Sequence, residues 1–184
     1  MARIVVIGGG PAGLSAALFT AKNGLDVDVF DTDETWLHHA YLFNYLGIEE
    51  KDGDEFLETA REQVSGFGAT LHEAEVTAVE QSGDGFVVTA DSDDYEADYV
   101  VLATGSSRDL AEELGCAFTD DDVVDVDVTM ETSVDDVYAT GAMVRTEEWQ
   151  AIISAGDGAA AALNVLSKEK GEHFHDFDTP EDAE

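Results

Sequence analysis

Residues 3–13 read RIVVIGGGPAG, an apolar run that ends in three glycines. A continuous Val/Ile run is typical of a strand buried on both faces of a parallel sheet. Gly8, Gly10 and Gly13 then have the spacing G-x-G-x-x-G, and apolar residues recur at helical spacing over positions 14–21. A glycine turn between a strand and a helix lets a pyrophosphate approach the backbone at the helix N-terminus. The stretch therefore predicts a phosphate-binding turn.

The residues that follow complete a βαβ unit. Asn23-Gly24 is a helix stop, and residues 25–30 alternate apolar and polar side chains as a strand does. Asp31 ends this second strand, where a carboxylate can accept hydrogen bonds from the ribose of a dinucleotide. The spacing of Asp31 from the glycines strengthens the prediction of a dinucleotide-binding unit.

The rest of the chain predicts one α/β domain over residues 1–170, a Rossmann-like parallel sheet with helices on one face and a three-stranded antiparallel β-meander on the other. A helix is expected from Asp54, and a longer one over residues 146–166 with Thr146 as its N-cap. The final residues, 171–184, are expected to form an acidic, disordered tail. The expected strands are 74–80, 86–90 and 94–98 for the meander, and 99–103 and 137–141 for the sheet.

The charge balance restricts the environment and the partners. The chain has 42 Asp and Glu residues against 8 Lys and Arg, a net charge of −34. Eight scattered basic residues cannot form a surface for nucleic acid, and no stretch is long and apolar enough to span a membrane. The acidity favours a halophile's high-salt cytoplasm over an acidic protein of ordinary salt. The single cysteine, Cys116, and a strand at the very start of the chain agree with a cytoplasmic protein without a signal peptide.

Five segments stand in order along the chain: VIGGGPAGLSAAL (6–18), NYLG (44–47), VVLATGSS (100–107), ETSVDDVYATGA (131–142) and QAIISAGDGAAAAL (150–163). They resemble the FAD-binding domain of the thioredoxin reductase-like pyridine nucleotide-disulfide oxidoreductases, and the resemblance covers nearly the whole chain. The first is similar to the family's first FAD motif, and the third to its central Ala-Thr-Gly motif. The fourth resembles its closing FAD motif, and the last its final helix. The second, NYLG, is similar to the family's Asn-aromatic-Pro-Gly motif, with Leu46 in place of Pro.

The resemblance implies FAD as the cofactor and assigns it a set of contacts. Asp31 would bind the ribose, Asn44 would lie near the flavin, and Val76 would meet the adenine edge through its backbone. Gln150 and Ala151 would present backbone amides to the flavin pyrimidine ring. The pyrophosphate would contact Gly8, Gly10, Pro11, Ala12 and Gly13, and the other cofactor positions would be Thr35, Ala103, Thr104, Gly105, Gly141 and Ala142.

The sequence also departs from the family. Only residues 106–140 separate the Ala-Thr-Gly motif from the closing glycine, where the family has an NADPH-binding domain, so we expect that domain to be replaced by a short segment, about 106–128. The catalytic Cys pair of that domain is absent as well. Ala142 stands where the family has an Asp on the FAD ribityl chain, and Asp33-Glu34 replaces a Gly-Gly beside the pyrophosphate. Both substitutions are expected to weaken FAD binding.

Weaker candidates each have a plainer interpretation. His38 and His39 are candidate proton donors at the flavin or exposed loop histidines, and Cys116 is a redox thiol or a small apolar filler. Trp36 and Trp149 either shield the cofactor or pack. Gly156-x-Gly158-x-x-Ala161 imitates a glycine fingerprint but lies inside a helix, where small residues allow close packing. A metal site could be formed in the tail by His173, His175, Asp176 and Asp178, but the plainer interpretation, a disordered acidic tail, is favoured and no metal is predicted.

These observations predict an FAD-dependent oxidoreductase or electron carrier whose redox partner is a second protein or a small diffusible donor or acceptor. It is not expected to be a dithiol thioredoxin reductase by itself. Two alternatives remain open: a non-catalytic FAD- or nucleotide-binding module, such as a sensor subunit, and a small NAD(P)H-dependent diaphorase or oxidase. A homodimer or a partner protein is expected to cover the flavin.

Overall fold

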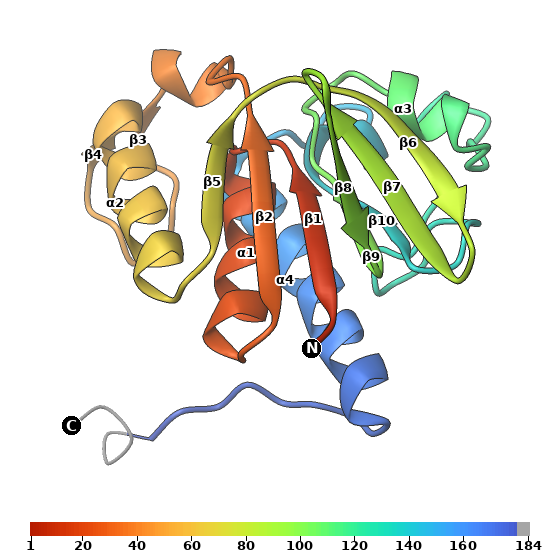
Figure 1. Ribbon diagram of the computed structural model, residues 1–184. Helices are drawn as coiled ribbons and strands as arrows, with labels where there is room; N and C mark the ends of the chain where they lie inside the picture. Colours follow the sequence, from red (N-terminus) through yellow and green to blue (C-terminus); the bar gives the residue numbers. More distant parts are fainter. Residues whose placement is uncertain (180–184) are drawn as a thin grey trace.

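The computed structural model describes residues 1–179 and contains a mixed α/β fold (Figure 1). The five strands of its main sheet are β1 (Arg3–Ile7), β2 (Asp26–Asp31), β5 (Thr70–Glu73), β9 (Tyr99–Leu102) and β10 (Val137–Ala139). The helices are α1 (Pro11–Lys22), α2 (Gly53–Gly66), α3 (Asp109–Glu113) and α4 (Ala151–Lys170), with short 3-10 helices η1 (Trp36–His39) and η2 (Gly141–Val144). The remaining strands are β3 (Tyr41–Leu42), β4 (Lys51–Asp52), β6 (Val76–Ser82), β7 (Gly85–Ala90) and β8 (Asp93–Ala97).

The main sheet is parallel and has the order β10-β9-β1-β2-β5. The central strand β1 pairs with β2 on one side, Ile4 opposite Val27, and with β9 on the other, Ile4 opposite Tyr99. A separate antiparallel sheet, β6-β7-β8, is the expected meander. The chain leaves β1 for α1 and β2 and later returns to the other side of β1, and in such sheets the crevice at the reversal point is the usual ligand site.

The four buried residues of β1 face two apolar layers in alternation. Ile4 and Val6 pack with α1, α2 and α4, whereas Val5 and Ile7 pack with the meander. Figure 1 shows α1 and α4 behind the sheet and β6–β8 in front of its β9 and β10 side. The fold class predicted from the sequence is confirmed, and the alternation of side chains along buried strands explains why Val and Ile occupy the buried positions of β1, Ile4 to Ile7.

Helices α1 and α4 approach each other closely because Gly158 has no side chain. A Cβ atom at Gly158 would lie 2.0 Å from the backbone oxygen of Ala12. The interpretation of the Gly156-x-Gly158 pattern as a packing feature is therefore confirmed at Gly158. The first turn of α1 thus rests on the middle of α4.

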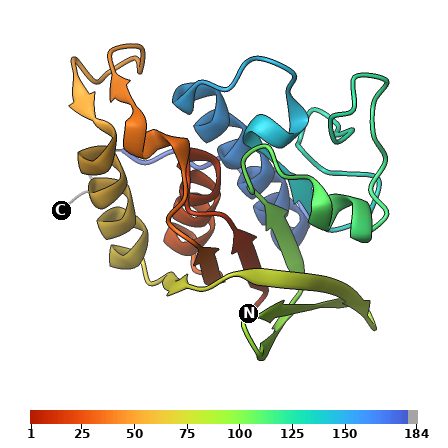
Figure 2. The ribbon, with the colours of Figure 1, turned by 90° about the horizontal axis from the view of Figure 1, so that it is seen from above.

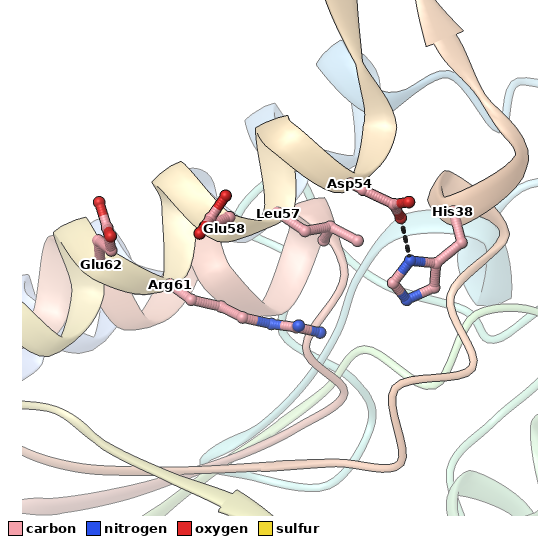
Figure 3. Close-up of a pocket in the computed structure, with 6 residues that line it drawn as sticks. All are labelled: His38, Asp54, Leu57, Glu58, Arg61 and Glu62. Carbon is pink, nitrogen blue, oxygen red and sulfur yellow. Dashed lines mark hydrogen bonds and ion pairs between the residues drawn. The ribbon is translucent and has the colours of Figure 1, made fainter.

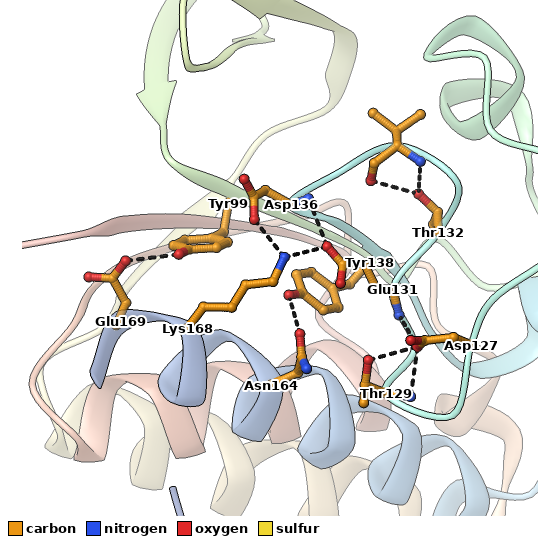
Figure 4. A network of polar contacts seen from close by, with 11 residues as sticks. Tyr99, Asp127, Thr129, Glu131, Thr132, Asp136, Tyr138, Asn164, Lys168 and Glu169 are labelled. Carbon is orange, nitrogen blue, oxygen red and sulfur yellow. Dashed lines mark hydrogen bonds and ion pairs between the residues drawn. The ribbon is translucent and has the colours of Figure 1, made fainter. Parts of the chain in front are cut away.

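A polar network holds the C-terminal half of α4 against the start of β9 and β10 (Figure 4). Lys168 donates to Glu131 and, at 2.8 Å, to Asp136. The Tyr99 hydroxyl donates to Glu169 at 2.8 Å, and the Tyr138 hydroxyl donates to Asn164 at 2.7 Å. Burial alone would lower the pKa of Lys168, but these carboxylate contacts outweigh it and raise that pKa above its usual range. The network fixes α4 from the end opposite to its N-terminus.

Several details differ from the expectations. Helix α4 begins at Ala151 with Gln150 as its N-cap, so the prediction of a start at Thr146 was wrong. Strand β5 and the short helix α3 were not predicted. Residues 180–184 of the expected disordered tail lie outside the described residues. Within 171–179 the tail contacts the body: Lys22 lies 2.8 Å from Asp176 and also contacts Asp178.

Candidate functional site

The carboxyl ends of β1, β2, β9 and β10 meet the N-termini of α1 and α4 at one edge of the sheet (Figure 2). The turn after β1 shows why its glycines are needed. Gly8 has a φ of +116°, and a Cβ there would lie 2.1 Å from the oxygen of Ala103, the residue after β9. A Cβ at Gly13 would lie 1.8 Å from the Gly8 oxygen. The turn is therefore closed to side chains on its inner side.

The outer side of the turn is open at Gly10. A Cβ at this position would have no neighbour closer than the Thr35 hydroxyl, at 3.4 Å. Gly10 is the N-cap of α1, Pro11 follows it, and Leu14 donates its amide to the Gly10 oxygen at 2.9 Å. The backbone can be approached closely here, as a pyrophosphate requires.

At two helix N-termini on this edge, the first backbone amides donate no hydrogen bond to a capping side chain of the described residues. Among the described residues no side chain caps α1 or α4, and neither helix has an acidic residue in its first turn. In contrast, α2 is capped by Asp52, whose carboxylate accepts from the amide of Asp54 at 3.0 Å. Free amides and the positive end of the helix dipole favour an anionic or electron-rich ligand group. The N-termini of α1 and α4 therefore leave backbone amides available to an anionic group, whereas Asp52 occupies the N-terminus of α2.

Asp31 lies where the sequence predicts it, against the turn. Its Oδ2 atom is only 2.2 Å from the place a Cβ would occupy on Gly9, so a larger residue at position 9 would displace the carboxylate. Thr35 lies beside Gly10 and accepts a hydrogen bond from the Leu37 amide at 3.4 Å as N-cap of η1. The structure thus brings Asp31 and Thr35 to the glycine turn.

The β9 and β10 side contributes a second group of predicted residues. Ala103 donates its amide to the Ile7 oxygen at 2.8 Å, and Thr104 donates its hydroxyl to the Ser107 oxygen at 2.7 Å. Gly141 has a φ of +73°, and a Cβ there would meet Ala12 at 3.3 Å and Ser154 of α4 at 3.4 Å. These contacts place the closing glycine between the two helix N-termini. Gly105, with a φ of +66°, ends the turn after β9.

An ion-pair cluster that the sequence did not predict lies on the α2 side of the turn. Figure 3 shows three of its members, His38, Asp54 and Arg61. Arg61 of α2 donates to Asp31 at 3.0 Å and to Asp33. His38 contacts Asp33 through Nε2 at 2.9 Å and Asp54 through Nδ1 at 2.5 Å. The hydrogen bond from Arg61 lowers the pKa of Asp33, and those to Asp54 and Asp33 raise the pKa of His38. Asp33 is therefore paired with Arg61 and, when His38 is protonated, with a second cation.

Other predicted residues are not brought into contact with the turn. Asn44 is exposed in the loop between β3 and β4, and His39 is exposed on η1. Val76 begins β6 and packs against the meander's apolar layer. Ala142 is half-buried in η2. Both ring nitrogens of His38 contact carboxylates, so ion pairing accounts for this residue, and its role as a proton donor stays a prediction.

Two further candidates have local explanations. The Trp36 and Trp149 rings lie 5.4 Å apart, and Trp149 donates its indole N–H to the Arg145 oxygen at 3.0 Å. The pair connects η1 to the segment before α4, while both rings stay partly exposed. Cys116 is buried, and burial raises the pKa of its thiol. A buried neutral thiol fits the apolar-filler interpretation of Cys116.

No described helix is long and apolar enough to cross a membrane. The described residues contain no group of three or more His, Cys, Asp or Glu side chains arranged to hold a metal ion.

Known proteins are similar to this chain over part of their own length. The bifunctional thioredoxin reductase/thioredoxin of Mycobacterium leprae is 37% identical over 110 residues, which are 57% of this chain and 24% of that protein. The dihydrolipoyl dehydrogenase of Haloferax volcanii is 29% identical over 177 residues, 90% of this chain and 34% of that protein. The chain thus spans about a quarter to a third of the length of these relatives.

Solved structures share the fold. A thioredoxin reductase from Gloeobacter violaceus superposes with a TM-score of 0.87 at 21% identity, covering 97% of this chain and 99% of that one. The family model described as pyridine nucleotide-disulphide oxidoreductase matches residues 2–108 and 53–159. The glycine turn that admits a backbone approach, Asp31 and the two uncapped helices fit the phosphates, ribose and flavin of FAD. The chain therefore belongs to the pyridine nucleotide-disulphide oxidoreductase family, whose members bind FAD.

Proposed function

We propose that this chain is an FAD-binding oxidoreductase or electron carrier whose redox partner is supplied in trans. The observation that carries the proposal is the meeting of two uncapped helix N-termini with a glycine turn and Asp31 at one sheet edge. When bound, FAD supplies hydride and single-electron chemistry that no side chain offers. The amides of α1 would hold the pyrophosphate, and those at Gln150 and Ala151 would favour negative charge on the reduced flavin ring.

The segment between the Ala-Thr-Gly motif and Gly141 supports the idea of a partner in trans. Residues 106–140 pack onto the body, with Ala111, Cys116 and Val124 buried in the layer they share with the meander. They contain α3 and two isolated bridges, Phe118 to Val124 and Glu131 to Tyr138. A segment of this size cannot form a second dinucleotide-binding domain. The electron donor or acceptor is therefore proposed to be another protein or a small molecule.

Exposed apolar side chains near the site support a covering partner, and a second copy of the chain is our proposal for it. Phe43 is 71% exposed, Leu46 90% and Trp36 63%, all within the segment that follows β2. Trp149, before α4, extends this surface through its contact with Trp36. Exposed apolar groups of this kind often mark an interface. The net charge of −34 supports a high-salt cytoplasm, where such a surface is screened.

A specific observation favours one alternative, a non-catalytic FAD-binding module. Asp33 and Glu34 add carboxylates beside the phosphate turn, and Ala142 offers no polar side chain to the cofactor. Both features reduce the affinity expected for FAD and the control of its redox state.

The test is an anaerobic titration of the FAD-loaded chain in concentrated KCl. NADH, NADPH and candidate reduced partner proteins are added in turn, and the flavin absorbance near 450 nm is recorded. Loss of that band with a partner protein, and its recovery with an acceptor, is the expected result. Loss with NADH or NADPH alone would instead identify a self-sufficient diaphorase. A flavin that stays oxidised with every donor, but is reduced by dithionite, would favour the non-catalytic module.

A further inference from the structure

Five acidic and basic side chains alternate along the α2 side of the candidate site: Asp31, Arg61, Asp33, His38 and Asp54. Arg61 Nη2 lies 3.0 Å from Asp31 Oδ2 and also donates to Asp33. Figure 3 shows Arg61 extending from α2 on the side of the His38 ring. Arg61 is the one member of this set that is positively charged at every working pH.

The position of this arginine matters because two carboxylates lie close to the phosphate turn. Asp31 Oδ2 lies against Gly9, and Asp33, at a φ of +59°, is only two residues further along. The carboxylates of Glu58 and Glu62 line the same depression as Arg61. Among the described residues, Arg61 is the only Lys or Arg that forms an ion pair with Asp31 or Asp33. Without Arg61 a diphosphate would approach an acidic surface.

We propose that Arg61 is a positioning residue of the cofactor site: it orients Asp31 toward the adenosine ribose and neutralises Asp33, so that the FAD pyrophosphate can approach the turn. This inference rests on the proposed function, since it concerns how this chain binds FAD. Arg61 does not touch the reacting atoms and acts through the two aspartates.

Asp31 can pair with Arg61 and accept hydrogen bonds from the ribose at the same time. A carboxylate offers about four lone-pair positions on two oxygens. Arg61 uses Oδ2, so further acceptor positions remain for ribose hydroxyls. The opposite arrangement, in which Arg61 competes with the ribose for Asp31, makes the contrary prediction, because removing the arginine would then tighten FAD binding.

The test is a set of FAD dissociation constants, measured by quenching of FAD fluorescence at one fixed KCl concentration. Arg61→Gln is expected to weaken binding about tenfold, equivalent to about 1.4 kcal/mol, and Arg61→Lys to keep most of the affinity. Asp33→Asn in the Arg61→Gln background should recover part of this loss, because it removes the carboxylate that Arg61 neutralises but leaves Asp31 without its arginine. The matched control is Arg3→Gln, which removes the same charge from a residue paired with Asp26 at the opposite end of β1.

Unchanged or tighter binding by Arg61→Gln would overturn the inference, and so would a double variant no better than Arg61→Gln alone. Melting curves without FAD show whether each variant is folded. If Arg61→Gln does not fold, retained affinity in Arg61→Lys together with tighter binding by Asp33→Asn would support the inference, and any other combination would overturn it. Failure of the wild-type chain to bind FAD would overturn the proposed function itself. If instead wild type and Arg61→Gln bind FAD equally well, only the inference about Arg61 is overturned.

Discussion

At the scale of single residues, two glycines that are two residues apart in α4 have opposite surroundings. A Cβ at Gly158 would lie 2.0 Å from the Ala12 oxygen, whereas a Cβ at Gly156 would meet nothing within 4 Å. Gly158→Ala should therefore reduce the free energy of unfolding by about 1–3 kcal/mol, because α1 and α4 must separate. Gly156→Ala should raise it by about 0.5–1 kcal/mol through helix propensity. Urea unfolding at constant KCl measures both, and equal effects would contradict the close contact of the two helices.

His38 makes part of the stability depend on pH. Hydrogen bonds to Asp54 and Asp33 raise its pKa above the ordinary 6.5, so the folded state holds the proton more tightly than the unfolded state. The resulting stability is fully present below pH 6.5 and disappears as the pH rises through the folded-state pKa. Arg61, whose pKa is raised, and Asp33, whose pKa the hydrogen bond from Arg61 lowers, keep their charges over that range.

The melting temperature of wild type should therefore exceed that of His38→Gln at pH 6 by more than at pH 9. The matched control is His39→Gln, since His39 is exposed on the same short helix. A difference between wild type and His38→Gln that is constant across this pH range would contradict the account.

The sequence predicts the residues whose roles follow from local geometry. The spacing of Gly8, Gly10 and Gly13 and the position of Asp31 at a strand end were sufficient to predict the tight turn and the place of Asp31 beside it, while their contacts with FAD stay predictions. Arg61 was missed because it lies 30 residues after Asp31, on a helix, and only the parallel pairing of β2 with β5 brings α2 beside Asp31. A sequence pattern carries no signal for that juxtaposition.

At the scale of elements, an ion pair ties the segment before α4 to that helix. Arg145 donates to Asp157 through Nε at 2.9 Å and Nη2 at 2.6 Å, and the Asp157 side chain is only 7% exposed. Arg145→Met should destabilise the fold by about 2–3 kcal/mol, because it leaves the Asp157 carboxylate without its partner. Loss of one partner from a fully buried pair costs more, roughly 3–5 kcal/mol, but Arg145 is partly exposed. Adding Asp157→Leu should recover most of this loss. Chemical unfolding is the measurement, and an Arg145→Met variant as stable as wild type would contradict the role of the pair.

The elements with a strong hydrophobic pattern were predicted, and the others were not. The strands β1 and β9 are continuous apolar runs, and the meander strands are separated by turn residues. Strand β5, TLHE, is a short edge strand with one large apolar residue, Leu71, so its parallel pairing is set by the tertiary structure. The start of α4 was misplaced because Thr146 resembles an N-cap, while the true N-cap, Gln150, has no capping hydrogen bond.

At the scale of the whole molecule, the charge of −34 makes stability depend on salt. Like charges on one surface repel, and the screening length falls from about 8 Å at 0.15 M salt to about 3 Å at 1 M. The melting temperature is expected to rise steeply with KCl up to about 1 M and more slowly above it. Sucrose at matched osmolality, which screens no charge, should produce a much smaller rise. A melting temperature that does not change with KCl would contradict this account of the acidic surface.

The central claim is that the sheet edge formed by the glycine turn, Asp31 and the uncapped ends of α1 and α4 binds FAD. Its most direct test is calorimetric titration of the flavin-free chain with FAD in concentrated KCl. We predict saturation at one FAD per chain, with binding abolished or greatly weakened when Gly10 is replaced by Glu, a carboxylate on the open side of the turn. Absence of saturable binding, or equal binding by Gly10→Glu, would contradict the account.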